Sequence, residues 1–427
     1  MMFGWLSIVR LGMVQMALGS VVVLTTSTLN RLMIVELALP AVLPGALVAL
    51  HYGVQITRPN WGFLSDSGGH RTRWIVGGVA TLAAGALLAA AAIPVLQTAM
   101  AVGLLLSILA YALIGFGVGA SGTSLLALLA TGTHPDRRAA AAMITWLMMI
   151  FGIAATAGIV GALLDPYSPA RLLRIVAGTC GAAFALTVLA TWRIERGLTP
   201  RPAPEPMPFR EGMAEVWAEP RARAFTGFVF LSMTAYFMQE LILEPYAGLV
   251  FAFTPGQSTT LSGAQNGGVF LGMLLVGISA TALKLGALRD WVIAGCTGSG
   301  LSLMAIAALG QTGTGLLVPA SVMLGFFNGM FTVAAIGAMM ALAGEGREAR
   351  EGTRMGLWGA AQAIAAGFGG LAGAAAVDAL RHGLATESAF GLVFTAEAVL
   401  FFAAALMAAR IMDGPRRAPA TGGKAHV

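Results

Sequence analysis

Apolar runs long enough to cross a lipid bilayer recur along the whole sequence, and this pattern limits the possible folds more than any other feature. A membrane core about 30 Å thick needs about 20 consecutive apolar residues in a helix. Of the 427 residues, 57% are hydrophobic and 10% are charged, whereas about 25% of the residues of an ordinary soluble domain are charged. The sequence therefore predicts an all-α, multi-pass membrane protein.

Charges, prolines and glycines divide these runs into twelve predicted transmembrane helices. The predicted spans are 11–30, 38–57, 74–96, 101–128, 139–163, 172–192, 223–245, 259–283, 290–310, 315–343, 354–376 and 389–411. A Pro- and Arg-rich stretch separates the sixth from the seventh and is expected to be a polar linker. The predicted organisation is a first six-helix bundle over 1–192, a cytoplasmic linker over 193–222, a second bundle over 223–412 and a cytoplasmic tail over 413–427.

The distribution of basic residues predicts the orientation of the chain. Because each bundle has an even number of spans, both termini and the linker must share one side of the membrane. All but four of the 25 Lys and Arg residues fall on that side, the exceptions being Arg31, Arg171, Arg174 and Arg381. Basic loops mark the cytoplasmic face, so both termini are expected in the cytoplasm. The same loops account for the net charge of +6, which does not indicate nucleic-acid binding.

The two halves of the sequence resemble each other. "LIGFGVGASGT" (113–123) aligns with "MLGFFNGMFTV" (323–333), and matching residues follow at Met143 and Met355, Trp146 and Trp358, Gly158 and Gly370, and Gly161 and Gly373. Asp165 and Asp378 end the two fifth helices. This register predicts a tandem duplication of six-helix units in parallel orientation, which is the arrangement of major facilitator proteins.

A polar stretch, "GFLSDSGGHRTRW" (62–74), lies between the second and third predicted helices. It resembles the loop signature of major facilitators in Gly62, Asp66, Gly69, Arg71 and Arg73. The glycines permit a tight turn, and the aspartate can pair with arginines or cap a helix. The resemblance implies a loop that couples helix movements, although an ordinary basic cytoplasmic loop explains the arginines as well.

Ionisable residues inside a membrane are costly and mark candidate functional positions. Asn30, Arg31 and Glu36 lie at the end of the first predicted helix, near the periplasmic boundary, where Glu36 can pair with Arg31. Glu240 and Glu244 are four residues apart and share one face of the seventh helix. These five residues and His51 are the candidate pigment- or substrate-binding residues. We expect no dense charge cluster of the kind that an ion-coupled drug or sugar exporter uses.

His51 is the only one of the five histidines predicted to lie inside a helix. A neutral imidazole can bind a metal, including the magnesium of a tetrapyrrole, but a lone helical histidine is more often a packed, hydrogen-bonded residue. Cys180 and Cys296 lie in separate apolar runs and are predicted to be small core residues. The sequence contains no HExxH, CxxC or phosphate-binding glycine loop, so we predict no catalytic residues and no metal site.

The segment from Arg10 to Gly78, and "TLNRLMIVELALPA" (28–41) within it, resembles the PucC/LhaA family of major-facilitator-like proteins. This family is also called the bacteriochlorophyll delivery family of purple phototrophic bacteria. The resemblance continues through the twelfth helix, and the length is that of the short member labelled a 44.5 kDa bacteriochlorophyll synthase chain. Asn30, Arg31 and Glu36 form the family-specific group of residues.

The resemblance implies an assembly factor for photosynthetic light-harvesting complexes. It would handle bacteriochlorophyll a as cargo in the intracytoplasmic (inner) membrane, with light-harvesting antenna polypeptides, bacteriochlorophyll synthase and membrane lipid as partners. The scarcity of charge in the helices suits a pigment with an isoprenoid tail. The sequence lacks the DxxxD pair with which prenyl transferases hold magnesium diphosphate, so the synthase label does not predict an enzyme. A secondary transporter and a non-catalytic subunit of a bacteriochlorophyll synthesis complex remain alternatives.

Overall fold

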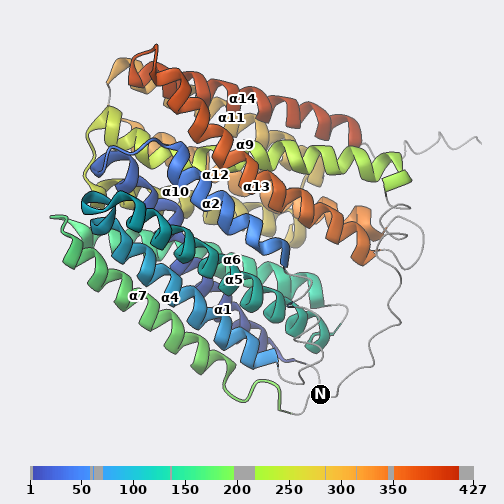
Figure 1. The fold of residues 1–427 in the computed structure, drawn as a ribbon. Coiled ribbons are helices and arrows are strands. Elements are labelled where there is room, and N and C mark those ends of the chain that lie inside the picture. The colour runs from blue at the N-terminus through green and yellow to red at the C-terminus, as the bar shows by residue number, and fades with distance from the viewer. Residues whose placement is uncertain are drawn as a thin grey trace, which may run out of the picture.

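The computed structural model describes residues 3–57, 61, 71–134, 137–196, 217–283, 285–313, 315–344 and 351–412, and all regular secondary structure in these ranges is helical (Figure 1). The predicted tail, 413–427, and most of the predicted linker lie outside the described residues. The domain boundaries therefore stay predictions.

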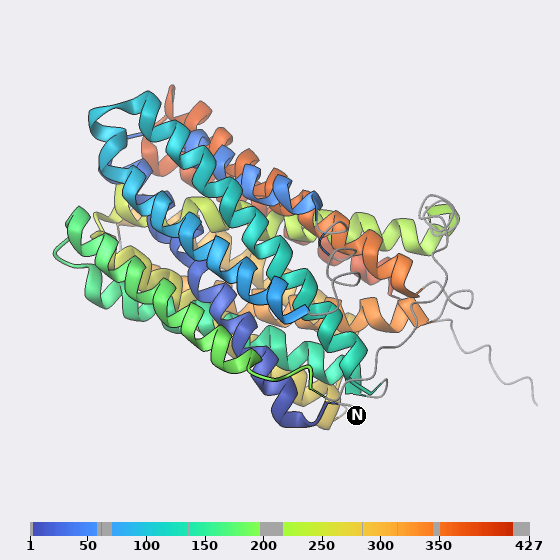
Figure 2. The same cartoon turned by 60° about the horizontal axis from the view of Figure 1, so that its bottom comes forward.

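The first half contains six helices that run back and forth along one common direction (Figures 1 and 2). Their bounds are α1 (Trp5–Val23), α2 (Val42–Val54), α4 (Arg71–Thr98), α5 (Met100–Gly132), α6 (Arg138–Leu164) and α7 (Pro169–Thr191). Two π-helical segments, Leu24–Leu29 and Leu32–Glu36, extend the run of α1, and a 3₁₀ turn, Gln55–Thr57, follows α2.

The second half repeats this pattern with six further helices. Their bounds are α9 (Pro220–Phe251), α10 (Pro255–Val276), α11 (Leu288–Thr312), α12 (Leu317–Gly344), α13 (Glu351–Arg381) and α14 (Thr386–Ile411). A π-helical segment, Gly277–Ala282, extends α10. Among the described residues, eleven helical runs are long and apolar enough to cross a membrane, and α2, with 13 residues, is a shorter apolar helix. The chain is thus a multi-pass membrane protein, as predicted, and its described residues form twelve principal helices.

Two predicted helix ends are wrong for the same reason. The first helix is predicted to end at residue 30, before Arg31, and the seventh at Pro245. Instead the first continues to Glu36 and the seventh passes through Pro245 to Phe251. Arg31 and Glu244 have hydrogen-bond partners in the other half of the protein, so they do not have to end the helix. Proline is tolerated inside membrane helices because neighbouring groups satisfy the freed backbone.

The helix packing follows the same order in both halves. In the first half α4 packs against α5 and α7, α1 against α6 and α7, and α2 against α5. The corresponding pairs in the second half are α11 with α12 and α14, α9 with α13 and α14, and α10 with α12. Each of these pairs in one half has its counterpart in the other, which is the arrangement expected of a parallel duplication.

The two halves meet through the fifth helix of one and the second helix of the other. These pairs are α6 with α10, and α13 with α2, which lie side by side in Figure 1. Glycines permit the close approach of α6 and α10: a Cβ at Gly263 would lie 2.7 Å from the backbone nitrogen of Gly158, and one at Gly161 would lie 2.6 Å from that of Thr260. Small residues at membrane-helix interfaces serve this purpose.

Each half also has its own apolar core. Cys180 is buried in the first core and Cys296 in the second, and both are free thiols. Their prediction as small core residues is confirmed. Trp358 is fully buried in the second core, with its ring 4.8 Å from that of Phe225.

The stretch predicted to couple helix movements is described only in part, because Gly62, Asp66 and Gly69 lie outside the described residues. Arg71 begins α4, and its Nη1 donates to the Ala127 carbonyl of α5 over 3.0 Å. Next to it, the Thr72 backbone N–H donates to Glu195 Oε1, after α7, over 2.7 Å. Arg73 is exposed. The described contacts thus join the start of α4 to other residues of the first half. The role in coupling helix movements stays a prediction.

Candidate functional site

The run that continues α1 turns its polar side chains toward the second half. From Leu24 to Glu36 the backbone is mostly π-helical. This conformation is rare in proteins overall but common at functional sites. Within this segment the Tyr111 hydroxyl of α5 donates to the Thr25 carbonyl over 3.0 Å. Ser27, Asn30 and Arg31, which this segment carries, are all buried.

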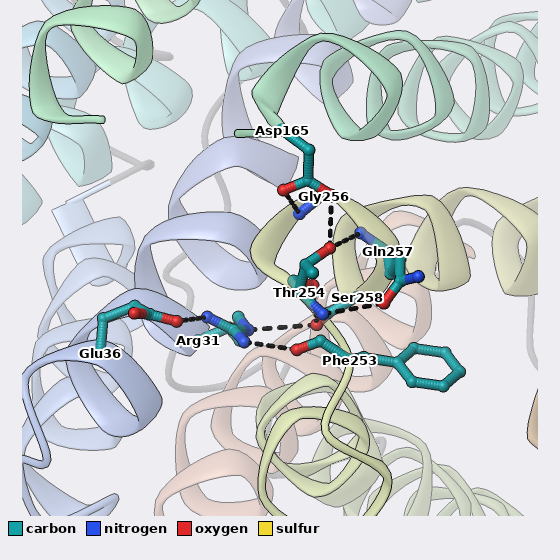
Figure 3. Close-up of polar contacts among 8 residues, drawn as sticks. All are labelled: Arg31, Glu36, Asp165, Phe253, Thr254, Gly256, Gln257 and Ser258. Atoms are coloured by element: carbon teal, nitrogen blue, oxygen red, sulfur yellow. Dashed lines mark hydrogen bonds and ion pairs between the residues drawn. The ribbon is translucent and has the colours of Figure 1, made fainter. Parts of the chain in front are cut away.

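Arg31 lies at the centre of the site, and its side chain is 2% exposed. Its Nη1 pairs with Glu36 Oε1 at 2.5 Å, which confirms the predicted ion pair. Its Nε donates to Ser258 Oγ over 3.1 Å, and its Nη2 donates to the Phe253 carbonyl over 2.7 Å (Figure 3). Both of the last two acceptors belong to the second half. Arg31 is therefore a buried contact between the two halves.

Three neighbours of Arg31 reach α9 and α10 in the same way. Asn30 Nδ2 donates to the Leu241 carbonyl over 2.8 Å. The Ser27 hydroxyl donates to Glu244, whose side chain is buried. The Thr28 and Thr259 hydroxyl oxygens lie 3.3 Å apart.

Arg31 and Glu36 share one end of the same helical run, whereas Glu244 is brought to this segment from the second half and accepts from Ser27. Glu240, one helical turn before Glu244, is partly buried and lies beside Thr26.

Asp165, at the end of α6, adds a contact that the sequence did not assign to a site. Its Oδ1 accepts the Gly256 backbone N–H over 3.1 Å, and its Oδ2 accepts the Thr254 hydroxyl (Figure 3). Thr254 and Gln257 form a capping box at the start of α10. A carboxylate is favoured there because the helix N-terminus carries partial positive charge.

Asp378, the counterpart of Asp165 in the repeat, makes the corresponding contact at the end of α13. Its Oδ2 accepts the backbone N–H of Val42, at the start of α2, over 2.6 Å. Each fifth helix therefore ends in an aspartate that caps the second helix of the other half. We call the group formed by Ser27, Asn30, Arg31, Glu36, Asp165, Glu244, Ser258 and Asp378 the inter-half cluster. The alignment of the two aspartates and the Thr-x-x-Gln signature of a capping box could have revealed this part of it.

His51 is placed elsewhere. It is 3% exposed and lies nine residues after Val42, roughly 13 Å along the axis of α2. Its Nε2 is 3.0 Å from the Gln55 amide nitrogen, and its ring is 4.9 Å from that of Tyr52. A magnesium ion at Nε2 would have to replace the contact with Gln55. The geometry suits a packed, hydrogen-bonded histidine.

Glu397 is a further ionisable residue outside the inter-half cluster. It lies in α14 and is fully buried, next to the backbone of Gln239 in α9. Among the residues that the structure describes, no group of three or more His, Cys, Asp or Glu side chains lies close enough to hold a metal ion.

Two duplicated six-helix halves, joined through their second and fifth helices, define a protein of the major facilitator type. Solved structures share this fold. The peptide transporter POT has a TM-score of 0.72 and 16% identity, with 96% of each chain covered. The nucleoside transporter NupG has a TM-score of 0.70 and 13% identity, covering 95% of this chain and 100% of the other. Likeness at this level of identity concerns the fold alone.

The sequence profile of the family described as PUCC protein matches residues 28–415, and the chain belongs to that family. It is 67% identical to the "Bacteriochlorophyll synthase 44.5 kDa chain" of Rhodobacter capsulatus, over 98% of this chain and 99% of that protein. It is 29% identical to "Protein PucC" of the same organism, over 95% of this chain and 92% of that protein. The family and the fold predicted from the sequence are both confirmed.

Proposed function

We propose that this chain is a non-enzymatic assembly factor that handles bacteriochlorophyll and delivers it to light-harvesting antenna polypeptides. Membership of the PUCC family supports this, as does a relative with 67% identity whose name links it to bacteriochlorophyll. The excess of arginines in the loops on one side supports an inner-membrane location with both termini in the cytoplasm.

The observation that carries the proposal is the engagement of Arg31. Its Nε, Nη1 and Nη2 all donate hydrogen bonds to groups of the protein itself. The Ser27 hydroxyl donates a hydrogen bond to Glu244 Oε1. A polar substrate would need these groups for its own hydrogen bonds, because a site for polar ligands depends on a few precisely placed polar groups. A cluster whose hydrogen bonds mainly join the two halves is better suited to a protein with an apolar cargo, such as a pigment with an isoprenoid tail.

The test is an absorption spectrum, with pigment extraction, of the tagged protein purified in mild detergent from a phototroph that makes bacteriochlorophyll. We expect bound bacteriochlorophyll and co-purified antenna polypeptides. A His51→Ala variant examines the one histidine placed inside a predicted helix. His382→Ala, at an exposed position after α13, is the matched control. Protein free of both pigment and antenna polypeptides would contradict the proposal.

A secondary transporter is the second candidate, and the carboxylates of α9 favour it. Glu240 is partly exposed beside buried Glu244, and ionisable groups at such depth serve proton relays in transporters. Uptake into vesicles that is driven by a proton or sodium gradient, and lost in Glu240→Gln or Glu36→Gln, would establish this function. Purification with bacteriochlorophyll synthase but without antenna polypeptides would instead indicate a subunit of a synthesis complex.

A further inference from the structure

A groove lies on the outer surface of the first half, where α7 packs against α1 and α6. It has a volume of about 640 Å³, which falls within the range of small-molecule sites. Figure 1 shows α7 at the outer edge of the bundle. Ile159 and Leu163 of α6 line the groove and are 61% and 56% exposed, so the groove faces the lipid rather than the space between the halves.

The two ends of the groove differ in chemistry. Arg171 and Arg174 lie at the end next to the connection between α6 and α7, and the rest is lined mainly by apolar and small side chains such as Ile175 and Ala182. The two arginines are three residues apart and so share one face of α7. Each uses one nitrogen for a hydrogen bond to a nearby carbonyl, of Pro166 and Ala170 respectively. A guanidinium has five N–H donors, so both arginines retain donors for an anion.

The length of the groove matches one lipid chain. From Arg171 to Leu186, α7 extends about 22 Å at 1.5 Å per residue. Half of a bilayer, with its head-group region included, is about 20–22 Å thick. An occupant with its head group at the arginines would therefore extend through one leaflet to about the membrane centre.

We propose that this groove binds a phospholipid with an anionic head group, whose phosphate lies between Arg171 and Arg174 and whose acyl chain lies along α7. Charge complementarity selects this occupant, because paired guanidinium groups match phosphate in geometry and charge. A bacteriochlorophyll tail would fill only the apolar part and would leave the arginines without an anion. The proposal does not depend on the function proposed above.

The experiment measures lipid binding to the purified, delipidated full-length chain by native mass spectrometry. Phosphatidylglycerol is compared with phosphatidylcholine carrying the same acyl chains. We expect preferential binding of phosphatidylglycerol. The double variant Arg171→Gln/Arg174→Gln should bind it roughly 30-fold more weakly, since each arginine near an anionic head group contributes roughly a fivefold factor. Arg381→Gln, which removes another exposed arginine at the end of a helix, should bind as the unmodified chain does.

A second pair of variants tests the apolar part of the groove. Gly178 lines the groove and Gly181 does not, and a Cβ at either glycine would meet no atom within 4 Å. Both Gly178→Leu and Gly181→Leu should therefore fold, but only Gly178→Leu should weaken lipid binding. Equal effects of the two would show that the chain does not lie in the groove.

Three other results would overturn the proposal. Equal binding of phosphatidylglycerol and phosphatidylcholine, which both carry a phosphate, would show that the net negative charge of the head group is not recognised. Full competition by inorganic phosphate would show a site for a free anion instead of a lipid. Displacement of the bound lipid by bacteriochlorophyll, with no effect of the arginine variants, would assign the groove to the pigment tail.

Discussion

Replacing Arg31 by methionine should destabilise the contact between the two halves. Arg31→Met keeps a long side chain and removes the charge, so it tests the hydrogen bonds with little change in packing volume. The ion pair with Glu36 should contribute little, because the Glu36 side chain is 35% exposed and exposed ion pairs are worth about 0–1 kcal/mol. The two buried acceptors, Ser258 Oγ and the Phe253 carbonyl, account for most of the effect.

The magnitude follows from these two bonds. A hydrogen bond from a charged donor contributes about 1.5–3 kcal/mol, and removal of the buried charge returns part of its desolvation cost. We therefore expect a net loss of about 2–3 kcal/mol. With an unfolding entropy of about 2.1 cal/mol/K per residue, a chain of 427 residues should lose about 2–3 °C in its unfolding midpoint.

The assay is thermal unfolding in mild detergent within a double-mutant cycle. Arg31→Met, Ser258→Ala and the double variant are compared, and the coupling between them should be about 1 kcal/mol. Arg381→Met, at an exposed position, is the control and should leave the midpoint unchanged. An unchanged midpoint in Arg31→Met, or additive effects in the double variant, would refute the role assigned to Arg31.

Three further predictions concern the same region. Asp165→Ala and Asp378→Ala should each lower the unfolding midpoint by removing a cap worth about 1 kcal/mol, and the loss should be larger for Asp165, which accepts two hydrogen bonds instead of one; equal losses would be inconsistent with the two geometries. Gly263→Ala should separate α6 from α10 and lower the midpoint, whereas Gly267→Ala, where a Cβ meets nothing within 4 Å, should not. Burial, followed by the charge of Glu36, raises the pKa of Tyr167 above its ordinary value of 10.0, and Arg31 opposes the shift. The contribution of neutral Tyr167 to stability is therefore present below pH 10 and is lost as the pH rises through the folded pKa. Tyrosinate absorption that is missing in Tyr167→Phe should appear only above pH 10.

The duplicated fold could be predicted because its signals are local and repeated. Spanning length follows from apolar runs, and the register shared by Trp146 and Trp358 relates the two halves. The pairing of Arg31 with Glu36 could also be predicted, since both lie at one end of the same helix. Each of these inferences needs only neighbouring residues or a comparison of the sequence with itself.

The inter-half cluster could not be predicted in the same way. Ser27 and Glu244 are 217 positions apart, and nothing in the sequence states which helix of one half faces which helix of the other. The charge of Arg31 suggested a helix end because an unpaired charge is costly inside a membrane. Its partners Ser258 and Phe253 remove most of that cost, but they become visible only once the halves are placed together.

The most direct test of the proposed function is deletion of the gene in its phototrophic host, with total bacteriochlorophyll and assembled light-harvesting complexes measured separately. The proposal predicts that pigment synthesis continues while the antenna complexes are lost, and that the unmodified chain restores them. Loss of bacteriochlorophyll itself would contradict the proposal and assign the chain to pigment synthesis. Unchanged levels of both would contradict it as well and would favour a transporter.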